Sequence, residues 1–257
     1  MELIDTHAHL YLNQFDEDIH EVIQRSVNHH VNKIILPNLD SHSVEAMLRL
    51  TGKYPENLFP TIGLHPTSVK SNYEDELKSI EEWLSKEKFY AIGEIGIDLY
   101  WDKTYLREQV IAFKHQIELA KKHHLPVIIH TRESYPEVLS IIDELNDETL
   151  NGVFHSFTGN REQAVQIIHC GFKIGIGGIV TFKNSGLGEV VKDIDLQNVV
   201  VETDAPFLSP VPKRGKRNES AYVRYIAEKL AEIHHCSLQQ IADTTTKNAV
   251  NLFQLDR

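Results

Sequence analysis

The sequence predicts an α/β protein with the (β/α)8 TIM-barrel fold, formed by a single domain over residues 1–257. Short apolar runs alternate with helical patterns along the whole chain, and no linker or low-complexity segment interrupts them. The length of 257 residues is also typical of an α/β barrel that folds as one domain. These observations together favour the barrel.

Eight apolar runs rich in β-branched residues are predicted to be strands. They are residues 2–5, 32–37, 58–64, 89–96, 125–130, 152–157, 172–178 and 198–204. Short buried strands separated by helices are typical of a parallel sheet, and eight such units close into a barrel. The rival is an open doubly wound sheet, which normally has a glycine-rich phosphate turn after its first strand. Here His-Ala-His follows the first run, so we expect the barrel.

The helices between these runs are predicted from periodicity and capping patterns. Residues 104–124 carry an apolar stripe at helical spacing, formed by Leu106, Val110, Phe113, Ile117 and Ala120. Asn160 followed by Gln163, and Ser237 followed by Gln240, each match a helix N-terminus whose two side chains cap one another. The glycine-interrupted segment after the seventh run predicts only a short helix.

Composition excludes several classes of protein. The net charge of −11 argues against binding nucleic acid along a broad basic face, although bound divalent cations can reverse the charge of a site locally. No run approaches the length of a membrane span, and the start lacks the features of a signal peptide. Cys170 and Cys236 have no metal-type spacing. We expect a cytoplasmic protein with free thiols and without a membrane partner; the sequence carries no signal for an oligomeric state.

Residue types that bind metals stand at the ends of most predicted strands. They are His7, His9, His65, Glu94, His130, His155 and Asp204. Each alone has an ordinary structural explanation, such as a hydrogen-bonded histidine or a turn-forming aspartate. In a barrel, however, the carboxyl ends of all strands meet at one mouth, and this convergence favours a metal site.

The number and type of these ligands predict two divalent ions. With His65 left aside, the other four histidines and the two carboxylates exceed what a single tetrahedral zinc needs, so they suit two ions bridged by a carboxylate. Mixed nitrogen and oxygen ligation suits zinc, manganese or nickel, and magnesium when water completes the shell.

Six motifs, in the same order along the chain, resemble the TatD family of metal-dependent deoxyribonucleases in the amidohydrolase superfamily. They are DTHAHL, GLHP, AIGEIGIDLYW, PVIIHTRES, GVFHSFTG and VVVETDAPFLSP with GKRNES. The resemblance extends from residue 2 to about residue 250. One departure is Ser220, which stands where relatives often have proline.

The resemblance implies two metal sites that share Glu94. The first would be formed by His7, His9, Glu94 and Asp204, and the second by Glu94, His130 and His155. Other branches of the superfamily bridge their ions with a carboxylated lysine, but no lysine ends the fourth predicted strand. Asp204 and Glu94 are therefore the predicted catalytic residues, with Asp204 as the candidate general base.

The activity that the resemblance implies is hydrolysis of an ester bond, as a deoxyribonuclease. We expect a phosphodiester of DNA to be cleaved by a water that two metals activate. The acidic charge favours a local grip on a strand end, which indicates exonuclease action on single strands. The 3'-5' direction on single-stranded DNA is an expectation from the family resemblance and not from the charge. An alternative is hydrolysis of an ester, lactone or amide, including an aminoacyl-tRNA ester. A non-catalytic binding role would predict lost ligands, and all six are present.

Further residues are predicted to contact the substrate. His65 is placed for a phosphate, with a structural histidine as the alternative, and Arg132 can reach a phosphate or pair with an acidic ligand. Cations cluster after the eighth strand, where barrels often bind phosphate, although such runs are often solvated loops. They are Lys213, Arg214, Lys216 and Arg217.

Two more interpretations concern residues beside the predicted ligands. Glu202 precedes Asp204 by two residues and is placed to orient a water or a ligand histidine. Tyr100 and Trp101 offer a stacking platform for a base, or else pack locally.

Overall fold

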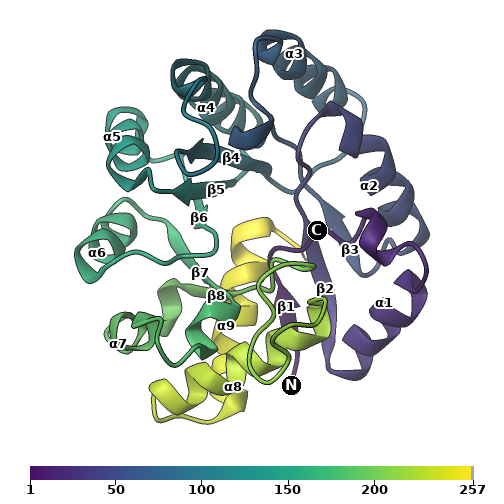
Figure 1. The fold of residues 1–257 in the computed structure, drawn as a ribbon, viewed down its shortest axis with the longest axis vertical. Helices are drawn as coiled ribbons and strands as arrows, with labels where there is room; N and C mark the ends of the chain where they lie inside the picture. The colour runs from purple at the N-terminus through teal and green to yellow at the C-terminus, as the bar shows by residue number, and fades with distance from the viewer. Residues whose placement is uncertain (256–257) are drawn as a thin grey trace.

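Eight parallel strands form the centre of the computed structural model, which describes residues 1–255; the end of the predicted domain, residue 257, lies outside them. The strands are β1 Leu3–Asp5, β2 Val31–Leu36, β3 Leu58–Pro60, β4 Ile92–Asp98, β5 Val127–Arg132, β6 Gly152–Phe154, β7 Lys173–Ile176 and β8 Val199–Val201. Figure 1 shows them around the middle of the molecule, with helices outside them. Each of the eight predicted runs therefore overlaps a strand.

Helices follow the strands along the described chain. They are α1 Ile19–Asn28, α2 Ser41–Lys53, α3 Tyr73–Leu84, α4 Leu106–His123, α5 Tyr135–Leu145, α6 Arg161–His169, α7 Leu187–Val191, α8 Val223–Ile233 and α9 Leu238–Phe253. Both predicted capping boxes are present, at the starts of α6 and α9. The glycine-interrupted helix is indeed short, because α7 has five residues. Within residues 1–255, no helix has the length and apolar character needed to cross a membrane.

The strands close into a barrel through two seams. Regular ladders join β1 to β3 and β4 to β8. Parallel bridges then link Ile62 with Ile92 at one seam and Ala8 with Ala205 at the other. At the second seam the amide of Asp204 also donates to the carbonyl of His7 at 2.9 Å. The predicted TIM barrel is thus confirmed.

Several strands end earlier than the apolar runs predict. β1 ends at Asp5 and β8 ends at Val201, so the polar residues after them lie on short connections beyond the regular ladder. Asp204 has a φ of 58°, which is incompatible with a continuing strand. The side chains at this end are therefore free to turn inward over the barrel instead of alternating across a sheet.

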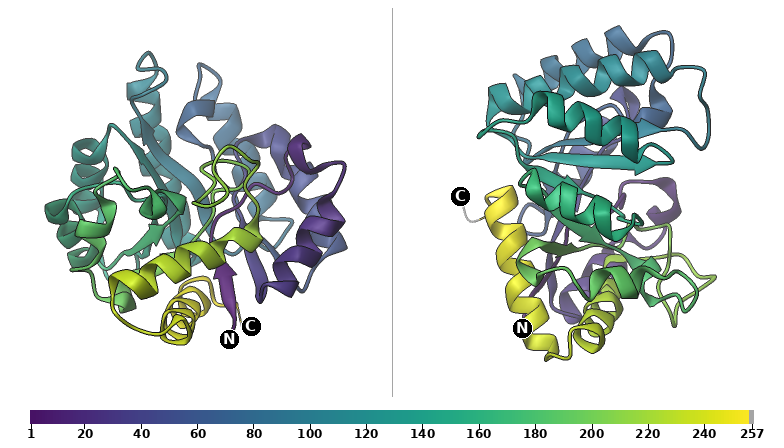
Figure 2. Two further views of the ribbon diagram at one scale, coloured as in Figure 1. Left: turned by 60° about the horizontal axis from the view of Figure 1, so that its bottom comes forward. Right: turned by 90° about the vertical axis from the view of Figure 1, so that its left-hand side faces the viewer.

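The opposite end of the barrel is closed by α9. Its Ala249 and Phe253 are buried in one apolar cluster with residues of the strands, including Ile4, Ile35 and Val200. Figure 2 shows α9 lying across the end where the chain enters β1, with both termini on that side. Because this end is plugged by apolar side chains, only the end at which the strands finish is open to a polar site.

Candidate metal centre

The six predicted ligands come together at the carboxyl ends of the strands. They are His7 and His9 after β1, Glu94 in β4, His130 in β5, His155 after β6 and Asp204 after β8. In the described part of the chain, ligand atoms lie within 4.8 Å of one another in three groups: His7, His9 and Asp204; His7, Glu94 and His155; and His65, Glu94 and His130. Residues from distant parts of the sequence thus form one cluster.

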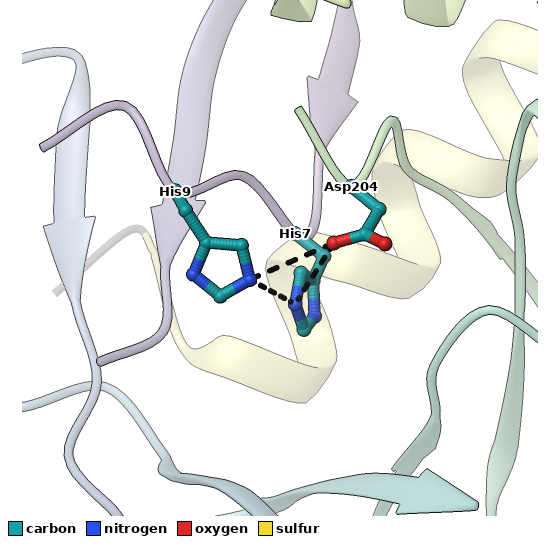
Figure 3. Close-up of side chains that lie close together, drawn as sticks. All are labelled: His7, His9 and Asp204. Carbon is teal, nitrogen blue, oxygen red and sulfur yellow. Dashed lines mark hydrogen bonds and ion pairs between the residues drawn. The ribbon is translucent and has the colours of Figure 1, made fainter. Parts of the chain in front are cut away.

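The first group has three ligand atoms facing a common point (Figure 3). The Nε2 atoms of His7 and His9 lie 3.2 Å apart, and Oδ1 of Asp204 lies 3.8 and 3.6 Å from them. His9 is oriented through Nδ1, which lies 3.1 Å from the carbonyl oxygen of Pro37. Since that bond requires a proton on Nδ1, the lone pair of Nε2 points at the other two ligands.

Glu94 joins the three groups because its two oxygens face different histidines. Oε2 lies 3.2 Å from Nε2 of His7. Oε1 lies 2.7 Å from both Nδ1 of His130 and Nε2 of His155. Burial raises the pKa of Glu94, but the surrounding histidines outweigh it and hold the pKa well below its usual range. The side chain is therefore an ionised carboxylate that lies between two sets of histidines.

The protonation of the cluster fits divalent cations. Burial lowers the pKa of His7, which leaves a lone pair available near neutral pH. Burial raises the pKa of Asp204, yet the nearby histidines, His9 above all, lower it by more, so this carboxyl is also ionised. His7 therefore offers a neutral imidazole and Asp204 an ionised carboxylate, which are the ligand states that zinc, manganese and related ions require. At His130 and His155 burial lowers the pKa, but the facing carboxylates raise it by more, so these two rings would release protons on binding a cation.

His65 lies closer to the cluster than a purely phosphate-binding residue needs to be. Its Nε2 is 3.2 Å from Oε1 of Glu94, and its ring centroid is 4.5 Å from that of His130. The other ring nitrogen lies 2.6 Å from the hydroxyl of Thr67. The sequence interpretation placed His65 at a phosphate; the geometry also makes it a potential metal ligand.

Glu202 lies directly behind His155. Its Oε1 is 3.4 Å from Nδ1 of His155 and accepts a hydrogen bond of 2.5 Å from the amide of Ser156. The carboxylate is buried and packs against Gly175, where a Cβ atom would collide with it. Glu202 is therefore positioned to hold the ring of a ligand histidine rather than to bind a metal.

Asp98 has the corresponding position behind His130, and the sequence analysis missed it. Its Oδ2 lies 2.9 Å from Nε2 of His130, whose other nitrogen faces Glu94. Burial raises the pKa of Asp98, and the bond to His130 lowers it by more, so the carboxylate is ionised. The available signal was strand alternation, since Glu94 and Asp98 lie four residues apart in one strand and face the same side.

Buried glutamines of α4 fix the strand ends that carry these residues. The side chain of Gln109 accepts a 2.9 Å hydrogen bond from the amide of Asp98. Gln116 accepts one of 2.6 Å from the amide of Leu64, which precedes His65. The apolar stripe predicted for this helix thus leaves out two polar residues that support the site.

The predicted phosphate-binding cations have different surroundings. Arg217 bonds to both carboxylate oxygens of Asp18, each at 2.7 Å. Arg132 lies with its guanidinium carbon 3.8 Å from the ring centroid of Tyr100. Arg214 stacks in the same way on Phe182, at 3.9 Å. Within the described residues, Arg217 is the one of these three that is neutralised by an ion pair.

The loop after β8 lines a basic cavity of about 500 Å³ against α1 and α8. Its cationic walls are Arg25, Lys213, Lys216, Arg217 and Arg224. Glu219 is the single carboxylate in the lining, and it accepts from Arg25 at 2.7 Å. In a chain of net charge −11, this cavity is a local concentration of positive charge.

Comparisons with known proteins agree on one family. The family model described as TatD related DNase matches residues 4–254. The chain is 40% identical to the "Uncharacterized metal-dependent hydrolase YabD" of Bacillus subtilis, covering 99% of this chain and 100% of that protein. It is 31% identical to the "3'-5' ssDNA/RNA exonuclease TatD" of Citrobacter rodentium, covering 98% and 97%. The crystal structure of the TatD homologue YjjV from Escherichia coli superposes with a TM-score of 0.92 at 29% identity, covering 98% of each chain.

Proposed function

This chain belongs to the TatD-related DNase family of metal-dependent hydrolases, and from this premise we propose that it hydrolyses phosphodiester bonds of single-stranded DNA as a 3'-5' exonuclease. One observation carries the proposal: the two oxygens of Glu94 face separate sets of histidines, as a carboxylate shared by two cations must. The nuclease named in Citrobacter rodentium supports the choice of substrate. We take the whole chain as one catalytic domain.

The proposal assigns two divalent ions to the cluster. His7, His9, Glu94 and Asp204 would hold the first, and Glu94, His130 and His155 the second. Such a pair supplies Lewis acidity, which lowers the pKa of water and offsets the negative charge of the phosphate. The ligand set suits zinc, manganese or nickel, and also magnesium with added water.

Asp204 is the residue that we assign to proton transfer. Its side chain is 16% exposed, against 2% for Glu94, so it is the ligand carboxylate that a substrate and a water can reach. Oδ1 faces the two histidines, whereas the other oxygen is turned away from them (Figure 3). Being ionised, that second oxygen is placed to accept the proton of an attacking water.

The phosphate of the substrate would be held by cations near the mouth. Arg132 extends from the end of β5, two residues after His130, and is exposed. Lys213 and Arg214 of the loop after β8 have no carboxylate within ion-pair distance in the described chain, so their charge remains available. Neutral His65 offers a further contact, since burial lowers its pKa more than Glu94 raises it. These groups give a local grip, in keeping with action at a strand end.

The two cysteines, Cys170 and Cys236, are free thiols, which supports a reducing compartment. We propose that the protein acts in the cytoplasm.

The test is degradation of a 5'-labelled single-stranded DNA oligonucleotide with Mg²⁺, Mn²⁺ or Zn²⁺, and with EDTA. Stepwise shortening from the 3' end is expected with metal only. The variant Asp204→Asn should degrade the oligonucleotide at least a hundredfold more slowly than wild type. The variant Asp243→Asn, on the surface of α9, should degrade it at the wild-type rate. If the metal-loaded protein shortens no DNA yet cleaves an aminoacyl-tRNA ester, a lactone or an amide, the nuclease proposal is wrong and the alternative hydrolase takes its place.

A further inference from the structure

Two aromatic side chains stand exposed at the end of β4. Trp101 has 68% of its surface accessible and Tyr100 has 50%, which makes Trp101 the most exposed large hydrophobic residue of the described chain. Their ring centroids lie 4.9 Å apart, edge to face. Exposing an indole to water forgoes the free energy that burial would supply, so such a surface usually marks a contact site.

The aromatic pair is tied to the metal centre through one carboxylate. Oδ1 of Asp98 accepts hydrogen bonds from the amides of Tyr100 and Trp101, at 2.9 and 3.1 Å. Oδ2 of the same side chain lies 2.9 Å from His130. A single buried aspartate therefore sets the position of a metal-ligand candidate and of the two aromatic residues beside it.

The loop is held at its other end as well. Asp102 pairs with Lys70 at 3.4 Å, and its Oδ1 accepts from the amide of Thr104 at 2.9 Å. Anchors on both sides of Tyr100 and Trp101 hold the loop in place. They reduce the conformational entropy that the loop would otherwise lose when a ligand binds.

A cation completes the surface. The guanidinium carbon of Arg132 lies 3.8 Å from the centroid of Tyr100 and 5.4 Å from that of Trp101. Arg132 thus occupies a face of Tyr100, while Trp101 keeps most of its surface free. An exposed indole beside a cation matches a nucleotide, which joins an aromatic base to an anionic phosphate.

We propose that Trp101, supported by Tyr100 and Arg132, forms a stacking subsite for an unpaired nucleobase of the nucleotide whose phosphate occupies the metal centre. This subsite rests on the proposed nuclease function and deepens it. A base can stack on the indole only after leaving its duplex partner, so the subsite provides a physical reason for a preference for single strands. The subsite recognises any nucleobase and does not distinguish one base from another, because every base has a stacking face.

The test compares 2'-deoxyadenosine 5'-monophosphate with 2-deoxyribose 5-phosphate, which has the same phosphate and sugar but lacks the base. The chain has two tryptophans, so Trp83→Phe in α3 leaves Trp101 as the sole indole reporter. In this background with Mg²⁺, the nucleotide should quench Trp101 fluorescence and the sugar phosphate should not.

Binding of both probes is then measured by calorimetry on wild type, Trp101→Ala and Trp101→Phe. Stacking on a side chain is worth about fivefold to a hundredfold in affinity. Trp101→Ala should lose this advantage of the nucleotide over the sugar phosphate, and Trp101→Phe should retain part of it. Val165→Ala, at a residue of α6 that is 60% exposed, should behave as wild type.

Equal affinity of wild type for the two probes, or an advantage that survives Trp101→Ala, would overturn the subsite. Absence of both binding and quenching at millimolar nucleotide would do the same. A protein that shows the base-dependent quench but degrades no oligonucleotide keeps the subsite and loses the proposed exonuclease activity. The two failures are therefore distinguishable.

Discussion

Replacing Asp98 by asparagine should weaken one of the two metal sites and spare the other. The carboxylate of Asp98 accepts from Nε2 of His130, and this leaves the lone pair of Nδ1 facing Glu94 and the cluster. In Asp98→Asn, the amide oxygen can still accept from the amides of Tyr100 and Trp101. The amide nitrogen, however, turns a donor towards His130 and favours the tautomer that carries its proton on Nδ1.

The expected loss of metal affinity follows from the hydrogen bond between Asp98 and His130 that the substitution removes. One buried hydrogen bond to a charged acceptor contributes about 1.5–3 kcal/mol. Residues behind metal-ligating histidines change affinity by about tenfold to a hundredfold, which is about 1.4–2.8 kcal/mol. The two figures agree, so we expect a loss of tenfold to a hundredfold for the ion at His130 and His155. The ion at His7, His9 and Asp204 should change by less than about threefold.

The assay is a competition titration with a chromophoric zinc chelator that resolves two binding events. The control is Asp102→Asn, which lies in the same loop but is 43% exposed and pairs with Lys70 and Thr104, away from the histidines. It should bind both ions as wild type does. Two unchanged affinities in Asp98→Asn, or an equal loss in the control, would refute the assignment of Asp98 to His130.

Three further predictions concern stability. Stripping the ions with EDTA should lower the Tm by about 5–10 °C per site, since saturation at a hundredfold excess over Kd stabilises by about 2.7 kcal/mol; an unchanged Tm in protein shown to be metal-free would contradict it. Arg217→Ala should cost about 1 kcal/mol in urea unfolding at neutral pH. Arg217 holds the pKa of Asp18 below its usual 3.8, so this contribution is present above that value and lost as the pH falls through the lowered pKa. The free energies of unfolding of wild type and variant should therefore converge as the pH becomes acidic. A difference between them that stays constant with pH would exclude the Arg217–Asp18 pair as the cause. Gly175→Ala should push Glu202 off Ser156 and destabilise the protein by about 1–3 kcal/mol, measured by thermal unfolding, whereas Gly188→Ala, with only ordinary contacts around the new methyl group, should not.

Much of the candidate site is predictable because it depends on local pattern. An apolar run ending in histidine, as before His130, specifies both a buried strand and a polar group at its end. The two capping boxes, at Asn160 and Ser237, are likewise decided by residues three apart and appear as predicted. Barrel topology then brings the strand ends to one mouth without further information from the sequence.

Contacts between distant segments were harder to predict from the sequence. Arg214 and Arg217 look equivalent in the loop after β8, yet among residues 1–255 only Arg217 meets a carboxylate, because the start of α1 places Asp18 beside it. The sequence suggested a phosphate contact for His65, but the bridge between Ile62 and Ile92 brings the segment after β3 beside β4, and Nε2 of His65 lies 3.2 Å from Oε1 of Glu94.

The sequence by itself determined the eight strands, the open mouth to which they lead and the types of ligand gathered there, since periodicity and strand-end residues are properties of short segments. Only the tertiary structure decided which oxygen of Glu94 faces which histidine, and that Asp98 and Glu202 stand behind His130 and His155. It also decided that α9 closes the other end of the barrel. Those arrangements arise from side-chain packing between segments that lie as far as 244 residues apart, and no local pattern carries that information.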